Sequence, residues 1–497
     1  MIRNIKINDG DAVRDLQTLI RQPSISAKNQ GLVECANLVA QIMLNAGIDT
    51  KLLYLTNNNN STEAEEEDNN SNIPSPPATQ PPPLLSSPPP PIVYGEVKSK
   101  SNPNGKTILF YNHYDVQPVE PIELWDKNPF SGNIEGNYIF GRGAADDKGE
   151  LIARIKALEY YIKKTNDVPC NVKFIVEGEE EIGSVHLKEY ISLYKEKFKC
   201  DGVIWESGFV DTRGRPIISL GQKGILSVEI ISKGPCRDVH SSLAALIENP
   251  AWSLVRLLNT LRDNNGKILI ENWYNELRDF TDEEMSLMEK EPFDENALKK
   301  EYGISCLVNN AKGIEVKKAF AGMPTCNISG LVSGYVGEGS KTVLPSIAIA
   351  RLDFRLVPDM VPQIQFERLK KHIRKYQLSN SNNNNNYNAA SSNNTTIEIR
   401  FLGAEPAART SINHPFVNII KEAAVEVYRD AIINVSSAGT GPMYYFNKLL
   451  GVPSVCIGGT DISNRSHSPN EYMRIDLLNK TIKCMIVILE KFAFSCY

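Results

Sequence analysis

The chain of 497 residues contains only six histidines, and none of its nine cysteines forms a CxxC pair. An odd number of scattered cysteines suits buried thiols in a reducing compartment better than a disulfide framework or a thiolate zinc site. The sequence also lacks an apolar run long enough to span a bilayer, and its first residues contain no apolar signal segment. We therefore predict a cytoplasmic protein that does not act in a membrane.

A strong charge of one sign is missing as well. The formal net charge is −5 and no basic stripe is visible, which argues against nucleic acid as the main partner. With 41% hydrophobic and 23% charged residues, the composition is that of a globular protein. The length exceeds what one hydrophobic core usually serves, so we expect two domains or one large α/β domain that carries an insertion.

Two low-complexity segments interrupt the chain, at residues 56–91 and 379–396, and Asn, Pro, Ser or acidic side chains dominate them. Such segments bury too little apolar area to offset the conformational entropy that ordering would cost. We expect both to be disordered surface insertions without a catalytic role. The first one separates two predicted strands, at 51–55 and 92–97.

Elsewhere, predicted strands and helices alternate. The first part of the chain predicts helix 29–46, strand 107–111, helix 149–164, strand 171–176, helix 184–197 and strand 202–205. This order predicts an α/β fold with a mostly parallel sheet flanked by helices. In such folds the chemistry lies at the carboxyl ends of the strands.

The pattern changes after about residue 218, which indicates a smaller inserted α+β domain. The predicted elements there are strand 224–232, helix 250–263, strands 326–335 and 346–356, and helix 362–377. Alternation then resumes with helix 414–428, strand 452–457 and helix 475–492. We therefore expect one domain formed by residues 1–218 and 403–497, and a second domain formed by residues 219–402.

A histidine and an aspartate follow one of the predicted strands. His113 and Asp115 lie just past strand 107–111. In an extended chain, residues two positions apart point to the same side. A metal-binding imidazole oriented by a carboxylate would explain this pair. A histidine that only caps the strand end is the alternative.

Acidic residues also follow the other strands. A glycine-rich segment, 140–149, contains Asp146, and its glycines allow a sharp turn close to a bound ion. A phosphate loop is the alternative, but no GK[ST] follows and the acids would repel phosphate. Strand 171–176 leads into the acidic run 177–181, and strand 202–205 leads into Glu206. Taken alone, such a run is usually a solvated face.

A second candidate imidazole, His467, lies late in the chain. Carboxylates crowded at the end of a sheet repel one another unless a cation or a proton compensates them. Two histidines with several carboxylates and no cysteine indicate a site for Zn²⁺, Mn²⁺ or Co²⁺. A Ca²⁺ site would not need the histidines, and no EF-hand loop occurs.

Six motifs occur in an order that resembles a known family: HYDVQP, GRGAADDKGE, EGEEEIGS, the histidine of RDVHSS, FRLVPDM and SHSPNE. They resemble the dinuclear zinc metallopeptidase family of carnosinases, Cys-Gly dipeptidases, glutamate carboxypeptidases, acetylornithine deacetylases and succinyl-diaminopimelate desuccinylases. The resemblance covers nearly the whole chain outside the two insertions and is greatest to the carnosinase-like dipeptidases. It implies a zinc-peptidase-like catalytic domain, an inserted lid and dimerisation domain, and a homodimer.

The resemblance also implies a metal centre and a reaction. Two divalent metal ions per subunit are expected, zinc first and manganese or cobalt otherwise, and small peptides are the expected substrates. The implied metal ligands are His113 and Glu206 for one ion, His467 and Glu181 for the other, and Asp146 as the bridge. A deacylase of N-acyl amino acids that uses the same site is the alternative function.

Further roles follow from the same resemblance. Asp115 orients His113, Glu180 is the general base, and His240 reaches the partner subunit's site to stabilise the oxyanion. The implied substrate-binding residues are Arg355, Thr342 and Thr440, with Arg355 binding a C-terminal carboxylate. The other three histidines are expected to be structural or surface residues: His186, His372 and His414.

Three details bear on this resemblance. A cis peptide is expected between Asp146 and Asp147. Glu206 stands where carnosinase-like members usually have Asp, and the loop 437–442 replaces a Gly-Gly-Ser-Ile-Pro-type loop. These two departures concern the substrate and not the metal centre.

Overall fold

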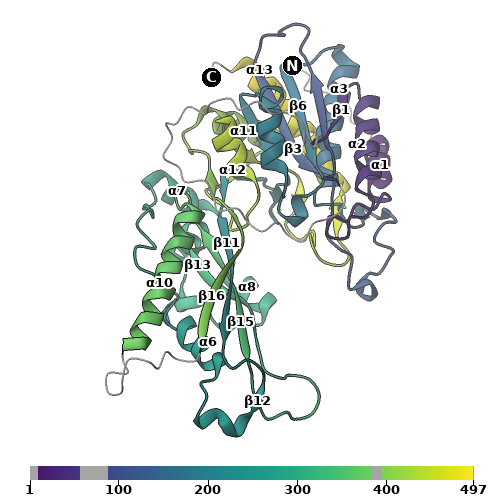
Figure 1. Cartoon of the computed structure of the whole chain (residues 1–497). Helices are drawn as coiled ribbons and strands as arrows, with labels where there is room; N and C mark the ends of the chain where they lie inside the picture. Colours follow the sequence, from purple (N-terminus) through teal and green to yellow (C-terminus); the bar gives the residue numbers. More distant parts are fainter. Residues whose placement is uncertain (1–8, 56–87, 383–394, 496–497) are drawn as a thin grey trace, which may run out of the picture.

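The structure is a computed structural model that describes residues 9–55, 88–382 and 395–495. It has two bodies, an α/β body and an elongated body built on an antiparallel sheet, joined where strand β11 (Gly224–Lys233) begins (Figure 1). Most of the two predicted insertions, residues 56–87 and 383–394, lies outside the described residues.

The α/β body contains an eight-stranded sheet with a parallel centre. Its strand order is β1 (Asp49–Leu53), β2 (Ile92–Val97), β6 (Asn171–Glu177), β3 (Thr107–His113), β7 (Gly202–Trp205), β19 (Ser454–Cys456), β9 (Ile217–Ser219) and β18 (Ile432–Asn434). Strands β6, β3, β7 and β19 pair in parallel, whereas β1 and β2 add an antiparallel edge. The predicted α/β fold is confirmed.

Both faces of this sheet are buried, which explains the continuous apolar runs of its strands. Ile108 and Phe110 of β3 belong to a core beneath the helices on one face, whereas Leu109 and Tyr111 belong to a core on the other face. The helices of the first core are α1 (Asp9–Ile20), α2 (Leu32–Asn45), α3 (Lys148–Thr165), α11 (Pro415–Tyr428) and α13 (Ile475–Phe494).

The second core lies beneath α4 (Leu187–Leu193), α5 (Lys195–Phe198) and α12 (Met443–Tyr445). The prediction of a single helix over 184–197 is therefore wrong. Two short helices occupy this stretch instead, because Tyr194 between them departs from helical geometry with φ −108° and ψ 23°.

The elongated body contains a four-stranded antiparallel sheet in the order β13 (Thr325–Ser333), β15 (Ile347–Leu356), β11 and β16 (Thr396–Glu405). Helices α6 (Pro250–Leu258) and α10 (Pro362–Asn382) pack on it around a separate apolar core. Helix α10 continues four residues into the segment predicted to be disordered from residue 379. The exact domain limits, 219 and 402, stay predictions.

Several shorter elements complete the fold. Helices α7 (Asp282–Lys290), α8 (Glu295–Tyr302) and α9 (Ile314–Gly322) were not predicted from the sequence. The short strand pairings are β4 (Asn133–Glu135) with β5 (Tyr138–Phe140) and β21 (Tyr472–Arg474), β8 (Phe209–Val210) with β20 (Thr460–Asp461), β10 (Gly221–Gln222) with β17 (Ala408–Arg409), and β12 (Val239–His240) with β14 (Val343–Leu344). No helix within the described ranges is both long enough and apolar enough to cross a bilayer.

Candidate metal centre

Three neighbouring parallel strands deliver acidic or imidazole groups to one edge of the large sheet. His113 is the last residue of β3, a short 3₁₀ turn with Glu180 and Glu181 follows β6, and Glu206 follows β7 directly. Because β6, β3 and β7 run in parallel, these groups gather at the same edge. The clustering predicted from the strand ends is therefore present.

The imidazole of His113 is fully buried and has a defined orientation. Its Nδ1 lies 3.0 Å from the backbone oxygen of Asp115 and 3.3 Å from the Asp115 carboxylate. Both partners accept hydrogen bonds, so Nδ1 carries a proton and the ring is turned with Nε2 toward the neighbouring carboxylates. Nε2 faces Asp146 Oδ1 at 3.2 Å and Glu206 Oε2 at 3.9 Å. This orientation would present Nε2 of His113 to a metal ion, which binds the neutral form of an imidazole.

The two oxygens of Asp146 face two different histidines. Oδ1 lies toward His113, whereas Oδ2 lies 3.1 Å from Nε2 of His467. The same nitrogen of His467 is 3.2 Å from Oε2 of Glu181. Asp146 therefore stands between two donor groups, which is the placement that a bridging carboxylate needs.

Asp147, joined to Asp146 by a cis peptide as the resemblance predicts, also lies close to His113 and Glu206. Its carboxylate accepts hydrogen bonds from Asn112 Nδ2 at 2.5 Å and from the backbone of Ser207 at 3.1 Å. Each oxygen of Asp147 accepts one of these bonds, so this carboxylate ties Asn112 and the segment after Glu206 to the site. Sequence reasoning assigned no role to Asn112, and no motif marked it.

The charges of this cluster are poorly balanced. Burial raises the pKa of Glu206, and the nearby Glu180 raises it further. Glu206 Oε2 is buried without a hydrogen-bond partner. Burial also raises the pKa of Glu180, against an opposing effect of His113. Hydrogen bonds that the His467 imidazole donates to the carboxylates of Asp146 and Glu181 raise the pKa of His467 to about 10. The groups therefore favour a bound positive charge.

The donor set fits divalent cations. Two groups of possible ligands are present, namely His113 with Asp147 and Glu206, and His467 with Asp146 and Glu181. Mixed imidazole and carboxylate donors suit zinc and related first-row ions. The orphaned oxygen of Glu206 is the kind of buried acceptor that such an ion would satisfy.

One contact ties the ligands to the predicted general base. The carboxylate of Asp115 accepts hydrogen bonds from the backbone N–H of Glu180 at 3.2 Å and of Glu181 at 3.0 Å. Asp115 was predicted only to orient His113. It also holds the turn that carries Glu180 and Glu181, which no sequence spacing could indicate.

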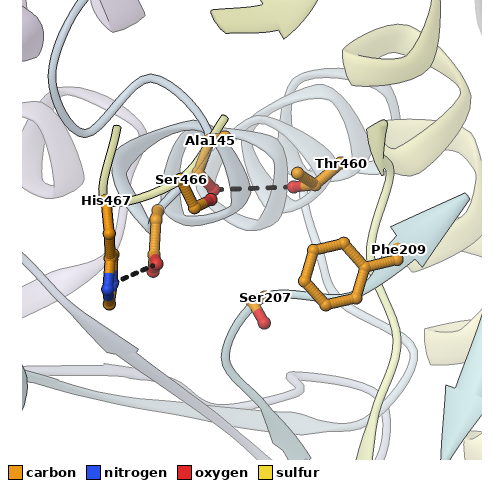
Figure 2. Close-up of a pocket in the computed structure, with 7 residues that line it drawn as sticks. Ala145, Ser207, Phe209, Thr460, Ser466 and His467 are labelled. Carbon is orange, nitrogen blue, oxygen red and sulfur yellow. Dashed lines mark hydrogen bonds and ion pairs between the residues drawn. The ribbon is translucent and has the colours of Figure 1, made fainter. Parts of the chain in front are cut away.

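A pocket opens beside these ligands (Figure 2). His467 lies on one side of it, and the ring of Phe209 lies across from it with Ser207 between them in the view. Thr460, whose Oγ1 lies 3.5 Å from the backbone oxygen of Ala145, forms a further wall. Sequence reasoning did not identify Ser207, Phe209 or Thr460. Their only mark in the sequence is their position, since Ser207 and Phe209 follow Glu206 and Thr460 precedes His467.

The structure places the predicted substrate residues in two separate groups. Arg355 donates a hydrogen bond of 2.6 Å to Thr440 Oγ1, which in turn donates to the backbone oxygen of Lys223 at 2.7 Å. His240 is exposed on β12, at the far end of the elongated body (Figure 1). The backbone of Thr342 contacts that of the adjacent Ser241 at 3.4 Å. Within one chain, His240 and Thr342 therefore lie away from the metal centre.

The remaining histidines occupy local structural positions. His186 Nδ1 contacts the carboxylate of Glu179 at 2.8 Å, and His372 Nε2 contacts Thr260 Oγ1 at 2.9 Å. His414 accepts a hydrogen bond from the backbone at the start of α11. None of the three belongs to the candidate ligand groups found among the described residues.

The fold and the donor set define an α/β protein with a carboxylate–histidine metal centre at the carboxyl ends of parallel strands. Residues 109–491 match the Peptidase family M20/M25/M40, and the chain belongs to this family. The resemblance read from the six motifs is therefore confirmed.

Individual relatives agree with this family. The chain is 32% identical over 282 residues to the Cys-Gly metallodipeptidase dug1 of Schizosaccharomyces pombe, covering 55% of this chain and 58% of that protein. It is 30% identical over 276 residues to the Beta-Ala-His dipeptidase of Rattus norvegicus, covering 55% of this chain and 56% of that protein. The matches thus span little more than half of these curated relatives.

A solved structure matches over a greater length. The M20 family metallo-carboxypeptidase of Sulfolobus solfataricus is 36% identical and superimposes with a TM-score of 0.81. The match covers 98% of this chain and 100% of that chain. It extends the likeness over both bodies of the molecule.

Proposed function

We propose that the protein is a dinuclear metal-dependent hydrolase that cleaves the amide bond of dipeptides or short peptides. The observation that carries this proposal is the placement of Asp146, whose two oxygens face His113 and His467 at 3.2 and 3.1 Å. One ion would be held by His113, Glu206 and Asp146, and the other by His467, Glu181 and Asp146. Zinc is the first candidate for both, with manganese or cobalt as alternatives.

Two bound cations supply positive charge that polarises a carbonyl and lowers the pKa of water. Glu180 accepts the proton of the attacking water and returns it to the leaving amine. Glu180 directly precedes the proposed ligand Glu181 in the same 3₁₀ turn, which supports a place for the base beside the reacting atoms. Asp115 fixes the backbone of Glu180, so the base is held at a defined distance from the ligands.

Arg355 and Thr440 are proposed to bind the substrate's C-terminal carboxylate. Among the described residues, no carboxylate lies within 4.0 Å of the Arg355 guanidinium, which instead bonds the Thr440 hydroxyl. A half-buried guanidinium without an acidic partner is suited to capture a carboxylate from the substrate. This arrangement supports a substrate with a free C-terminus.

His240 is proposed to act in the site of a second subunit within a homodimer, with Thr342 beside it. The backbone N–H of Ser242 donates to His240 Nδ1 at 3.2 Å, so the neutral ring carries its proton on Nε2. That nitrogen is therefore a donor suited to an oxyanion. The distance of β12 from the metal centre of its own chain supports a role across subunits (Figure 1).

Peptides are favoured over N-acyl amino acids, because the relatives found above are named dipeptidases or a carboxypeptidase. The likeness to the carboxypeptidase covers almost the whole chain, which favours cleavage of longer peptides from the C-terminus as a second candidate. A cytoplasmic location remains our proposal. It is supported by the eight free cysteines of the described residues.

The test compares hydrolysis by the purified protein, loaded with Zn²⁺, Mn²⁺ or Co²⁺, of dipeptides, longer peptides and N-acetyl amino acids. We expect turnover of dipeptides above that of the acetylated compounds. The variant Glu180→Gln keeps the shape of the side chain but cannot accept a proton. It should retain its metal and lose about 10²–10⁴-fold in turnover. Near-normal turnover in that variant, or no peptide hydrolysis by the parent protein, would overturn the proposal.

A further inference from the structure

A single buried carboxylate joins the loop that carries Asp146 to the loop that carries His467. Glu471 is fully buried and lies four residues after His467. Its Oε1 accepts hydrogen bonds from the backbone N–H groups of Ala145 at 3.0 Å and Asp146 at 3.1 Å. Its Oε2 accepts from Gly143 N at 3.0 Å and from Arg142 Nη1 at 2.8 Å.

The strand register brings this carboxylate to the Asp146 loop. Tyr472 of β21 pairs with Phe140 of β5, and one position further the backbone N–H of Gly141 donates to the carbonyl of Glu471 at 2.9 Å. The Asp146 loop leaves β5 at this point, and the His467 loop enters β21 there. The two loops therefore start from one strand pair, and the Glu471 side chain continues their contact.

Arg142 holds the carboxylate in place and is itself buried, with 2% of its surface exposed. Its second guanidinium nitrogen, Nη2, donates to the backbone oxygen of Pro118 at 3.0 Å, and the guanidinium lies 5.3 Å from the ring of Trp125. Nη1 also lies 3.4 Å from the backbone oxygen of Ser468, next to His467. Arg142 thus contacts the His467 loop and the segment after Asp115.

A contribution to stability alone does not explain the buried ion pair of Glu471 and Arg142. Replacing a buried ion pair by apolar side chains of similar volume is often neutral or stabilising. Glu471, however, uses all four of its usual acceptor positions on donors from the other loop. Three of these donors are the backbone N–H groups of Gly143, Ala145 and Asp146. The arrangement therefore specifies the position of Asp146 relative to His467.

We propose that Glu471, held by Arg142, is a positioning residue that sets the separation between Asp146 and His467. It thereby controls the affinity for the cation that Asp146, His467 and Glu181 would hold. The inference rests on the proposed metal centre. Asp146 would serve both cations, so the selectivity comes from His467, which lies on the same loop as Glu471. The bonds of Glu471 reach residues 142–146 but neither His113 nor Glu206.

The variant Glu471→Gln has nearly the same shape, but its amide nitrogen is a donor. Whichever way the amide is turned, this nitrogen faces two donors, either Arg142 and Gly143 or Ala145 and Asp146. The matched control is Glu150→Gln. Glu150 is also fully buried and accepts from Gly459 N at 2.6 Å and Thr460 Oγ1 at 3.0 Å, without contacting Asp146 or His467.

The first measurement titrates the metal-free full-length protein with Mn²⁺ and with Zn²⁺ in the parent, Glu471→Gln and Glu150→Gln forms. We expect Glu471→Gln to weaken the binding of one of the two ions by about 10–100-fold, which is the usual effect of changing a residue that orients a metal ligand. The affinity for the other ion should change much less. Adding Glu471→Gln to His467→Ala should then have little effect on the remaining ion, which identifies the weakened site.

The second measurement needs no metal. Amide hydrogen exchange of residues 141–147 should be faster in metal-free Glu471→Gln than in the parent, and unchanged in Glu150→Gln. If Glu471→Gln does not fold, Arg142→Lys replaces it and should give the same selective loss with a smaller size. Equal weakening of both ions, the same loss in Glu150→Gln, or unchanged exchange in 141–147 would overturn the proposal. A parent protein that binds fewer than two ions would instead refute the metal centre, while the exchange result still tests the role of Glu471.

Discussion

The backbone N–H of Glu180 donates a hydrogen bond to Oδ1 of Asp115 at 3.2 Å. The same carboxylate lies 3.3 Å from Nδ1 of His113. One side chain thus fixes both an imidazole that would bind metal and the backbone of the residue that would move the proton. A change at Asp115 should therefore affect metal affinity and turnover together.

Asp115→Asn tests this double role. Its amide keeps one acceptor oxygen, so one of the two backbone N–H groups of Glu180 and Glu181 loses its partner. We expect metal affinity to fall by about 10–100-fold, the range for groups that orient a ligand. Turnover at saturating metal should also fall. The control Asp49→Asn alters an aspartate whose side chain is 69% exposed, and it should leave both unchanged. If Asp115→Asn reaches full turnover once metal is restored, the contact with Glu180 has no role in catalysis.

The second prediction separates Asp146 from its neighbour Asp147. In Asp146→Asn only one oxygen remains, so the residue cannot face both histidines with a carboxylate oxygen. Asp147→Asn removes an acceptor that bonds Asn112 or Ser207. Elemental analysis after dialysis should find far less metal in Asp146→Asn than in Asp147→Asn. If the parent protein holds no more than one ion at saturation, the dinuclear arrangement is wrong.

Local patterns were sufficient to predict the parallel sheet and the acidic strand ends. The strands β3, β6 and β7 are apolar on both faces, and the side chains at their ends are visible in the sequence. The contacts that organise the site were not predictable. Glu180 N meets Asp115 across 65 positions, and Asp146 N meets Glu471 across 325. Such contacts depend on the order of strands in the sheet, which no local pattern contains.

Helix α7 begins with a start signal that is visible in the sequence. Thr281 accepts from the backbone of Glu284, and the Glu284 side chain accepts from the backbone of Thr281, which is a capping box. The spacing of these two residues marks a helix start in the sequence. Helix α8 is polar and none of its residues is buried, so it has no core-facing side that a sequence pattern could reveal.

The third prediction concerns pH and Glu405, at the end of β16. Burial raises the pKa of this carboxyl from 4.5 to about 8, and the charge of Glu177 adds to this effect against the hydrogen bond from Tyr445. The folded protein therefore holds the proton more tightly than the unfolded chain. The Glu405 contribution to the free energy of unfolding is full below about pH 4.5 and is lost as the pH rises through about 8.

Glu405→Gln keeps an acceptor for the Tyr445 hydroxyl and removes the titration. We expect the midpoint of thermal unfolding of this variant, compared with the parent, to increase steadily between pH 5 and pH 8.5. Glu398→Gln is the control on the same strand, where an exposed carboxyl pairs with Lys233. The hydrogen bond from Lys233 lowers the pKa of Glu398, so the control should show no such trend. A constant difference across this range would contradict the raised pKa of Glu405.

The fourth prediction tests whether two subunits share a site. Glu180→Gln and His240→Ala should each be inactive alone. When they are mixed and exchange subunits, one site of the heterodimer receives both wild-type residues and the other receives neither. Partial activity should therefore return. Mixing Glu180→Gln with Asp146→Ala is the control, because both changes affect residues of the same subunit's site. No recovery despite proven exchange would refute the role of His240 across subunits.

The last prediction concerns Arg355, whose guanidinium bonds the Thr440 hydroxyl at 2.6 Å. Lysine keeps the charge of this residue but not the planar pair of donors that binds a carboxylate through two hydrogen bonds. Arg355→Lys should raise KM steeply for peptides with a free C-terminus and much less for their amidated forms. Arg351→Lys is the matched control, because Arg351 lies on the same strand and pairs with Glu229 at 3.1 Å on an exposed face. If Arg355→Lys weakens both kinds of peptide equally, Arg355 serves the structure through Thr440 and the carboxylate binds elsewhere.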